Sequence, residues 1–255
     1  MQQLRRLSGR RAARLEAGAF VIDGPVLIRA AMEAGVGLRE VFASSDADPT
    51  LLAELAAAGV VVLEVRDEVL ARAVDTVTPQ GLAAIADRVE ASVADAVAAA
   101  AVGPLALVLV DVGDPGNAGT LVRSADAAGA AAVIFCGASV DPSSPKCVRA
   151  SAGALFHLPV AGGGDPMSVV HQLRGAGVRT AATVVRGGAP YDAVDLAGPL
   201  ALVLGSEAHG LPDALVEVVD QRLSIPMAGR SESLNVAMAG SILAFEALRQ
   251  RRGAR

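Results

Sequence analysis

Short apolar runs alternate with stretches of helical periodicity along most of the chain, and this alternation is typical of an α/β protein. In the N-terminal part, four runs have the length and composition of strands, namely 19–23, 39–44, 60–65 and 82–89. Two of the intervening helical patterns end at Gly35 and Gly59, and glycine commonly terminates helices. The pattern therefore predicts a small α/β domain.

The C-terminal part contains longer apolar runs with few polar interruptions, which are typical of strands buried on both faces of a parallel sheet. These runs occupy 105–112, 131–137, 179–185 and the first half of 199–211. Helical patterns occupy 120–128, 167–175 and 233–249, and a short apolar run at 223–227 precedes the last of them. We therefore expect a parallel sheet covered by helices.

The stretch between these two parts, residues 91–104, is almost pure Ala and Val and ends in the breaker Gly103-Pro104. Its helix propensity is high and its side chains carry no chemistry, which favours a connecting helix or a linker. The sequence thus predicts three segments. They are a first domain at 1–96, a linker at 97–103 and a second domain at 104–255.

Composition excludes several classes of protein. The chain is 53% hydrophobic, which is typical of a globular protein. No apolar run approaches the roughly 18 residues of a membrane span, and the N-terminus lacks the apolar core of a signal peptide. Cys136, Cys147 and three histidines lack the spacing of metal ligands. We expect a reduced, cytoplasmic protein without a metal or a membrane partner.

The formal net charge of −5 alone argues against a nucleic-acid partner, but positive charge gathers near the N-terminus. Residues 1–14 hold five arginines and no acid, and Lys146 is the only lysine of the chain. Arginine suits contacts with phosphate better than lysine does. Two interpretations stay open: a segment that contacts a nucleic acid, or a solvated helix in a protein poor in lysine.

Three expected strand ends carry unusual polar groups: 117–123, 205–210 and 225–235. Ligands of open α/β sheets bind beyond the carboxyl ends of the strands, so the three segments predict one shared site. The glycine-rich turn at 113–119 precedes the helix expected at 120–128, which Asn117 can cap, and this arrangement is compatible with a phosphate site at a helix N-terminus. That turn matches neither common nucleotide fingerprint, which leaves a phosphate-binding enzyme as the weaker alternative.

Together these segments resemble the three motifs of the SpoU-type, or SPOUT-class, RNA 2′-O-ribose methyltransferases. The motifs are N-x-G-x-x-x-R (Asn117, Gly119, Arg123), G-x-E-x-x-G (Gly205, Glu207, Gly210) and IPM…ESLNV (225–236). The resemblance covers about 104–252, and Ala208 stands where the family often has glycine. The FVIDG and TPQG segments of the first half are similar to the family's N-terminal substrate-binding domain, which is related to a ribosomal protein. The resemblance implies a parallel sheet with a C-terminal trefoil knot.

The resemblance also implies S-adenosylmethionine as the cofactor and assigns roles to residues. The cofactor would be held by Leu204, Gly205, Ile225, Met227 and Leu234. The catalytic group would comprise Arg123, Asn117, Glu207, Ser233 and Asn235. The family assigns proton removal to the motif arginine. Because a guanidinium has a pKa above about 12, we prefer Arg123 as an electrostatic clamp and leave base catalysis open.

The implied partners are RNA and a second copy of the chain. The N-terminal domain favours 23S ribosomal RNA. Transfer RNA, or a catalytically silent RNA-binding protein of the same fold, is the alternative. In the family, the motif arginine of one chain faces the cofactor loops of the other. The last helix carries both apolar residues and small residues, which suits a two-fold homodimer, although burial of both faces within one chain is equally compatible.

Overall fold

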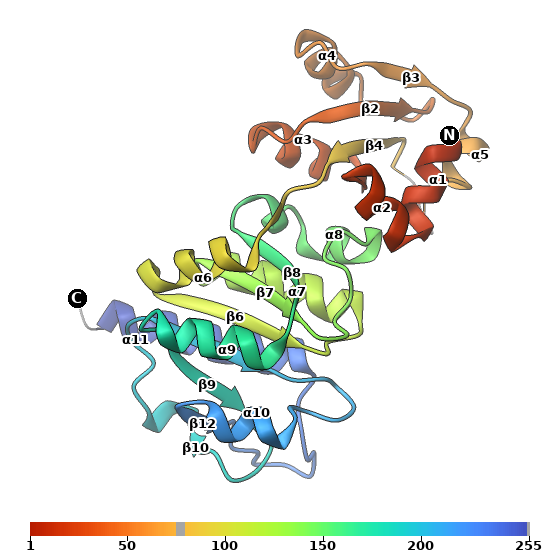
Figure 1. Ribbon diagram of the computed structural model, residues 1–255. Helices are drawn as coiled ribbons and strands as arrows, with labels where there is room; N and C mark the ends of the chain where they lie inside the picture. Colours follow the sequence, from red (N-terminus) through yellow and green to blue (C-terminus); the bar gives the residue numbers. More distant parts are fainter. Residues whose placement is uncertain (75–79, 254–255) are drawn as a thin grey trace. The chain divides into compact units, whose positions relative to one another are not determined.

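The computed structural model describes residues 1–74 and 80–253, so Thr78 and Pro79 of the TPQG segment lie outside the described residues (Figure 1). The chain forms two compact units, Met1–Val89 with Ser143–His157, and Glu90–Pro142 with Leu158–Arg255. This division differs from the predicted ranges in two places. Helix α6 (Val93–Val102) belongs to the second unit, because Ala96, Val97 and Ala100 are buried in its core. Residues 143–157 belong to the first.

The first unit is built on a four-stranded mixed sheet in the order β1-β4-β2-β3. The strands are β1 (Ala19–Asp23), β2 (Leu38–Ala43), β3 (Val62–Glu64) and β4 (Leu82–Asp87). All four coincide with predicted strands. Strand β4 runs antiparallel to both β1 and β2, whereas β2 and β3 are parallel.

Helices cover both faces of this small sheet. One face carries α1 (Gln2–Gly9), α2 (Arg11–Ala17) and α5 (Asp67–Ala71), whose apolar residues share one core cluster with β1, β2 and β4. The helices α3 (Pro25–Glu33) and α4 (Pro49–Ala57) pack through other buried residues, including Ile28 and Leu55. Figure 1 shows these two groups of helices on opposite sides of the sheet.

Residues 143–157 add two short helices, α8 (Pro145–Ser151) and η1 (Ala154–Phe156), to the first unit. The ring of Phe156 lies 6.3 Å from that of Phe20 on β1, between centroids. Arg149 lies 3.6 Å from the carboxylate of Asp23. Burial raises the pKa of Asp23, and the charge of Arg149 opposes that effect. The sequence pattern predicted no helix or strand in this segment.

The second unit contains an eight-stranded sheet in the order β10-β12-β9-β11-β6-β7-β8-β5, and every neighbouring pair is parallel. The strands are β5 (Glu90–Ala91), β6 (Leu105–Val110), β7 (Ala132–Cys136), β8 (Val160–Gly164), β9 (Arg179–Thr183), β10 (Ala189–Pro190), β11 (Leu200–Leu204) and β12 (Gln221–Ser224). The central strands β6, β7 and β11 are buried along their whole length. The predicted parallel sheet is therefore confirmed, and the knot stays a prediction.

Two helical layers enclose this sheet. Helices α6, α9 (Pro166–Gly175) and α10 (Asp213–Val218) share one core cluster with alternate residues of the central strands. On the other layer, α7 (Pro115–Ala127) packs against α11 (Val236–Gly253), and a short turn η2 (Tyr191–Ala193) also contacts α11. The two helices approach closely at Gly240, where a Cβ atom would lie 2.3 Å from Leu121 Cδ2. Among the described residues, no helix has the length and apolar character that a bilayer crossing requires.

Candidate active site

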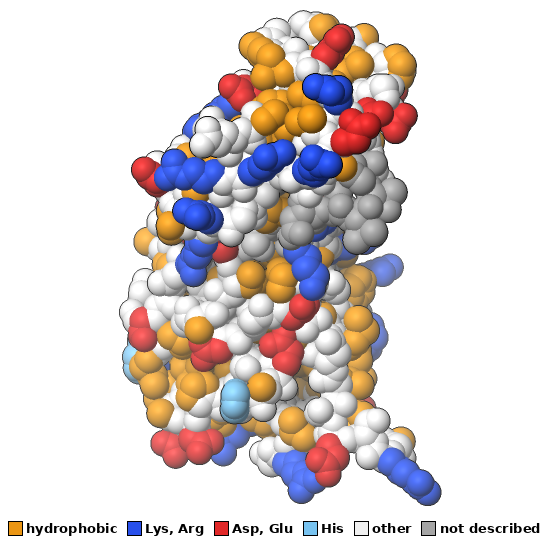
Figure 2. Space-filling model, turned by 90° about the vertical axis from the view of Figure 1, so that its right-hand side faces the viewer, with side chains coloured by type: hydrophobic (Ala, Val, Ile, Leu, Met, Phe, Trp, Pro, Cys, Tyr) orange, Lys and Arg blue, Asp and Glu red, His pale blue; other side chains and the backbone are white. Residues whose placement is uncertain are grey.

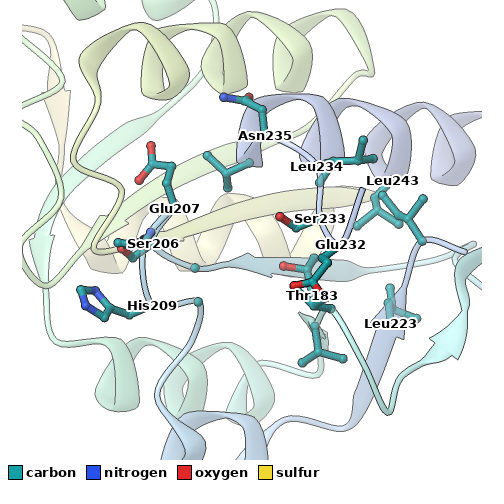
Figure 3. A pocket seen from close by; sticks show the side chains of 18 of the residues that line it. Thr183, Ser206, Glu207, His209, Leu223, Glu232, Ser233, Leu234, Asn235 and Leu243 are labelled. Atoms are coloured by element: carbon teal, nitrogen blue, oxygen red, sulfur yellow. Dashed lines mark hydrogen bonds between the residues drawn. The ribbon is translucent and has the colours of Figure 1, made fainter. Parts of the chain in front are cut away.

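A cavity of about 580 Å³ opens where β9, β11 and β12 end and α11 begins (Figure 3). Its walls come from three segments that are distant in the sequence. The lining residues are Thr183, Val184, Val185, Gly205, Ser206, Glu207, Ala208, His209, Gly210, Leu223, Ile225, Met227, Glu232, Ser233, Leu234, Asn235, Val236, Ala239 and Leu243. The cavity therefore lies at the carboxyl ends of parallel strands, as expected for an open α/β sheet.

A chain of hydrogen bonds joins the three predicted motifs beside this cavity. The Asn117 amide nitrogen Nδ2 donates to Glu207 Oε1 at 2.8 Å. Its oxygen Oδ1 accepts from Asn235 Nδ2 at 3.0 Å. Asn117 thus uses both ends of its amide to hold together a loop after β11 and the start of α11. An amide can do this because it carries a donor and an acceptor on one planar group.

Helix caps place two of these side chains. Asp114 caps α7, since its Oδ1 accepts from the Asn117 N–H at 2.8 Å, and Pro115 opens the helix. The prediction that Asn117 is the cap was therefore wrong, because the helix begins earlier than its apolar pattern and leaves the Asn117 side chain available. Asn235 does cap α11, with Oδ1 accepting from the N–H groups of Ala237 at 2.9 Å and Met238 at 3.3 Å.

The loop after β11 is held in a tight turn. Ser206 and Gly210 exchange two backbone hydrogen bonds, at 3.1 and 2.8 Å. A Cβ atom on Gly205 would lie 2.4 Å from the Gly210 carbonyl carbon and 2.6 Å from the Leu211 nitrogen. Only glycine fits here without moving backbone, so Gly205 fixes the position of Glu207.

The cavity collects most, but not all, of the predicted site residues. Seven of them line it, namely Gly205, Glu207, Ile225, Met227, Ser233, Leu234 and Asn235. Leu204 is fully buried behind the wall, close to Gly240. Asn117 reaches the cavity only through its bonds to Glu207 and Asn235. Arg123 is exposed on α7 and does not line the cavity.

Several lining residues escaped the sequence analysis. Thr183, Val184 and Val185 follow an ordinary strand pattern, so nothing local in the sequence marks them. Thr183 Oγ1 donates to the Val203 carbonyl at 3.2 Å, which joins the ends of β9 and β11. Across the mouth, exposed Arg186 lies 3.7 Å from Glu232.

The charges of the lining favour one kind of ligand. Glu207 and Glu232 contribute carboxylates, and no lysine or arginine is among the residues that line the described cavity. The rest is largely apolar, with Ile225, Leu234 and Leu243 on the wall. Such a site suits an amphipathic ligand that is neutral or positively charged, and it disfavours one rich in phosphate.

The fold and the site define a two-unit α/β protein whose larger unit holds a ligand cavity at the carboxyl edge of a parallel sheet. Residues 104–245 match the SpoU rRNA Methylase family, and residues 1–84 match the MRM3-like substrate binding domain. The chain belongs to the SpoU rRNA methylase family.

Named relatives extend this result. The 23S rRNA (guanosine(2553)-2′-O)-methyltransferase RlmP of Bacillus subtilis is 33% identical over 233 residues, which are 91% of this chain and 89% of RlmP. A 23S rRNA (uridine(2479)-2′-O)-methyltransferase of Streptomyces viridochromogenes is 41% identical over 142 residues, 54% of this chain and 50% of that protein.

Solved structures agree over the full length. The SpoU methyltransferase AviRb from Streptomyces viridochromogenes, in complex with AdoMet, has a TM-score of 0.86 and 30% identity, and the match covers 99% of this chain and 98% of AviRb. An AdoMet-bound rRNA methyltransferase from Sinorhizobium meliloti has a TM-score of 0.84 and 32% identity. The match covers 97% of this chain and 93% of that protein.

Proposed function

We propose that the protein transfers a methyl group from S-adenosylmethionine to a ribose 2′-hydroxyl of RNA, and that this RNA is 23S ribosomal RNA. The observation that carries the proposal is that Asn117 forms hydrogen bonds with both Glu207 and Asn235 beside one cavity. The relatives named above act on 23S rRNA, and two of the similar structures hold AdoMet. With ribosomal RNA as the substrate, the proposal places the protein in the cytoplasm.

The residues of the cavity fit this cofactor. Ile225, Met227 and Leu234 supply an apolar wall suited to an adenine ring. Gly205 allows the loop after β11 to fold tightly against the backbone of Gly210 and Leu211. The carboxylates of Glu207 and Glu232 favour a positive charge. When bound, S-adenosylmethionine supplies an electrophilic methyl group on a positively charged sulfur. Leu204 supports the wall from behind.

The protein must also make a ribose hydroxyl reactive. A 2′-hydroxyl is a weak nucleophile, so the negative charge that develops on its oxygen needs a partner. In our proposal, exposed Arg123 clamps the RNA phosphate and this oxygen with its guanidinium, the hydroxyl proton passes to water, and S-adenosylhomocysteine leaves as a neutral thioether. A guanidinium whose pKa is above about 12 stays charged and suits a clamp better than a base. Asn117, Ser233 and Asn235 hold the loops that frame the reaction.

Calorimetric titration separates this function from that of a phosphate-binding enzyme. We expect S-adenosylmethionine to bind at one site per chain, and ATP and NAD to bind far more weakly. The physical reason is that their phosphates would meet the Glu207 and Glu232 carboxylates in a described lining that holds no lysine or arginine, with Arg186 at the mouth already paired with Glu232. A Glu232→Gln variant should bind S-adenosylmethionine somewhat more weakly, since it loses one favourable charge. Tighter binding of ATP or NAD than of S-adenosylmethionine would refute the assignment.

We also propose a homodimer formed through α11. The small residues Ala237, Gly240, Ser241 and Ala244 are buried or partly buried, and Gly240 and Ser241 contact α7 of the same chain. The apolar residues on the free side remain exposed: Met238 by 53%, Ile242 by 37% and Phe245 by 47%. An apolar stripe of this kind suits an interface with two-fold symmetry. In the proposed dimer, Arg123 of one protomer completes the cavity of its partner.

Mixing two inactive variants tests this sharing. We expect Arg123→Ala and Asn235→Ala to be inactive alone and to regain activity after co-refolding. Random pairing makes half of the dimers mixed, and one of their two sites is intact, so about a quarter of wild-type activity should return. Arg123→Ala co-refolded with itself is the control. Dimers in light scattering that show no recovery would refute shared sites, and monomers at micromolar concentration would refute the dimer.

A further inference from the structure

The face of the first unit covered by α1, α2 and α5 carries five exposed arginines. They are Arg5, Arg10, Arg11, Arg66 and Arg72, which we call the arginine face. The three helices share one core cluster, and the Ser8 hydroxyl on α1 donates to the Ala73 carbonyl beyond α5 at 3.1 Å. Figure 2 shows arginine or lysine side chains gathered in a band over the N-terminal unit. The helices that these five residues belong to or flank therefore pack together on one face of the sheet.

Other arginines of this unit are already bonded to neighbouring groups. Arg29 lies 2.8 Å from Asp48 and 3.2 Å from Glu54, on the opposite face of the sheet. Arg39 lies 2.7 Å from Asp87. Arg6 pairs with Glu16, and Arg14 is buried and donates to the Leu7 carbonyl at 2.7 Å.

The arginine face differs in this respect. Within residues 1–74 and 80–253, none of its five members forms an ion pair or a side-chain hydrogen bond. The acid closest to it in sequence, Asp67, accepts instead from the Ser45 N–H at 3.0 Å and from the Ser45 hydroxyl at 2.8 and 2.9 Å. The exposed acids on these helices are Glu16, which pairs with Arg6, Asp67 and Glu68, so the arginines leave this face with a net positive charge in a chain whose net charge is −5.

We infer that the arginine face binds the sugar–phosphate backbone of the RNA substrate. The inference rests on the proposed function, and it assigns the contact to one face of the N-terminal unit and to named side chains. One guanidinium group can donate two parallel hydrogen bonds to two oxygens of a phosphate. Each such contact releases counterions from the RNA. The opposite face offers less available charge, because its Arg29 is already paired with two carboxylates.

The residue types on this surface favour phosphate contacts over base recognition. Proteins that read unpaired bases stack them on exposed aromatic rings. The chain has no tryptophan and a single tyrosine, Tyr191, which lies in the second unit. In the first unit Phe20 and Phe42 are buried, and the half-buried Phe156 packs against Phe20. We therefore expect the arginine face to bind helical RNA with little dependence on sequence.

The test compares two double variants of the full chain that lose the same charge. Arg11→Gln with Arg72→Gln removes two members of the arginine face, and glutamine preserves helix propensity. Arg29→Gln with Arg174→Gln removes two arginines that are paired with acids, Arg174 with Asp220. Each variant is titrated with a short RNA duplex of arbitrary sequence at several salt concentrations, and with S-adenosylmethionine as a measure of the intact second unit.

We expect the first double variant to bind the duplex about tenfold more weakly. The negative slope of log K against log salt should become shallower by about two. The control should stay within about twofold of wild type, and both should bind S-adenosylmethionine normally. Equal losses of affinity in the two variants, or no loss in the first, would refute RNA binding by the arginine face without refuting methyl transfer. If wild type methylates no unmodified 23S rRNA transcript, the proposed function fails instead.

Discussion

Replacing Arg123 with alanine is expected to lower the rate of methyl transfer by at least about 100-fold, which is the usual cost of losing a group that stabilises developing charge. The affinity for S-adenosylmethionine should stay within a few-fold of wild type. The reason is geometric, because Arg123 lies exposed on α7, outside the cavity lining, and its side chain forms no hydrogen bond or ion pair with the described residues. Single-turnover methylation of an unmodified 23S rRNA transcript measures the first quantity and calorimetry the second.

An Arg123→Lys variant separates the clamp from a base. Lysine keeps the positive charge but loses the planar fork, so a clamp predicts partial activity with an unchanged pH profile. If Arg123 is a base, the pH–rate profile of the variant should shift towards the lower pKa of lysine, which is about 10.4 in the unperturbed side chain. Near-normal turnover by Arg123→Ala would remove this residue from the mechanism altogether.

Strand prediction succeeded where burial alone decides the composition. The runs at 105–112, 131–137 and 199–204 are apolar because β6, β7 and β11 are covered by helices on both faces. The strand β8 was missed, since its sequence, Val-Ala-Gly-Gly-Gly, is dominated by glycine. Gly162 there faces the Glu90 carboxylate, which a Cβ atom would approach within 2.5 Å. Long-range contacts of this kind leave no periodic signal in the sequence.

The same limit explains the segment at 143–157. No helix was predicted there, yet Pro145–Ser151 is a helix that packs on β1 of the first unit. Phe156 packs against Phe20, and Arg149 pairs with Asp23, and each partner lies more than a hundred positions earlier in the sequence. A chain that returns to an earlier unit in this way cannot be foreseen from local propensity.

The candidate site was predicted through motif resemblance more than through local pattern. Side-chain types at three strand ends suggested one site, and the cavity brings two of those ends together directly. The third end joins them through Asn117, whose bonds to Glu207 and Asn235 span 90 and 118 residues of sequence. The end of β9 contributes Thr183 and the two valines after it with no polar signal at all.

Replacing Gly205 with alanine is expected to weaken S-adenosylmethionine binding roughly ten- to 100-fold. The added methyl carbon would lie 2.4 Å from the Gly210 carbonyl carbon, 2.6 Å from its oxygen and 2.6 Å from the Leu211 nitrogen. These are backbone atoms of a turn closed by two hydrogen bonds between Ser206 and Gly210, so the turn itself must move. Overpacking of this kind typically costs about 1–3 kcal/mol. The displaced turn carries Glu207, so its bond to Asn117 should weaken as well.

Gly229 offers a matched control in the loop on the other side of the same site. A Cβ atom there meets nothing within 4 Å, so Gly229→Ala adds the same methyl group without a clash. Calorimetry should give wild-type affinity for Gly229→Ala and the loss described for Gly205→Ala. Thermal unfolding shows whether the two proteins remain folded, since a shifted turn at the edge of the sheet leaves the core of β6, β7 and β11 in place. Equal affinities in a folded Gly205→Ala protein would mean that the close approach of the turn does not shape the cofactor site, and Gly205 would lose its assigned role.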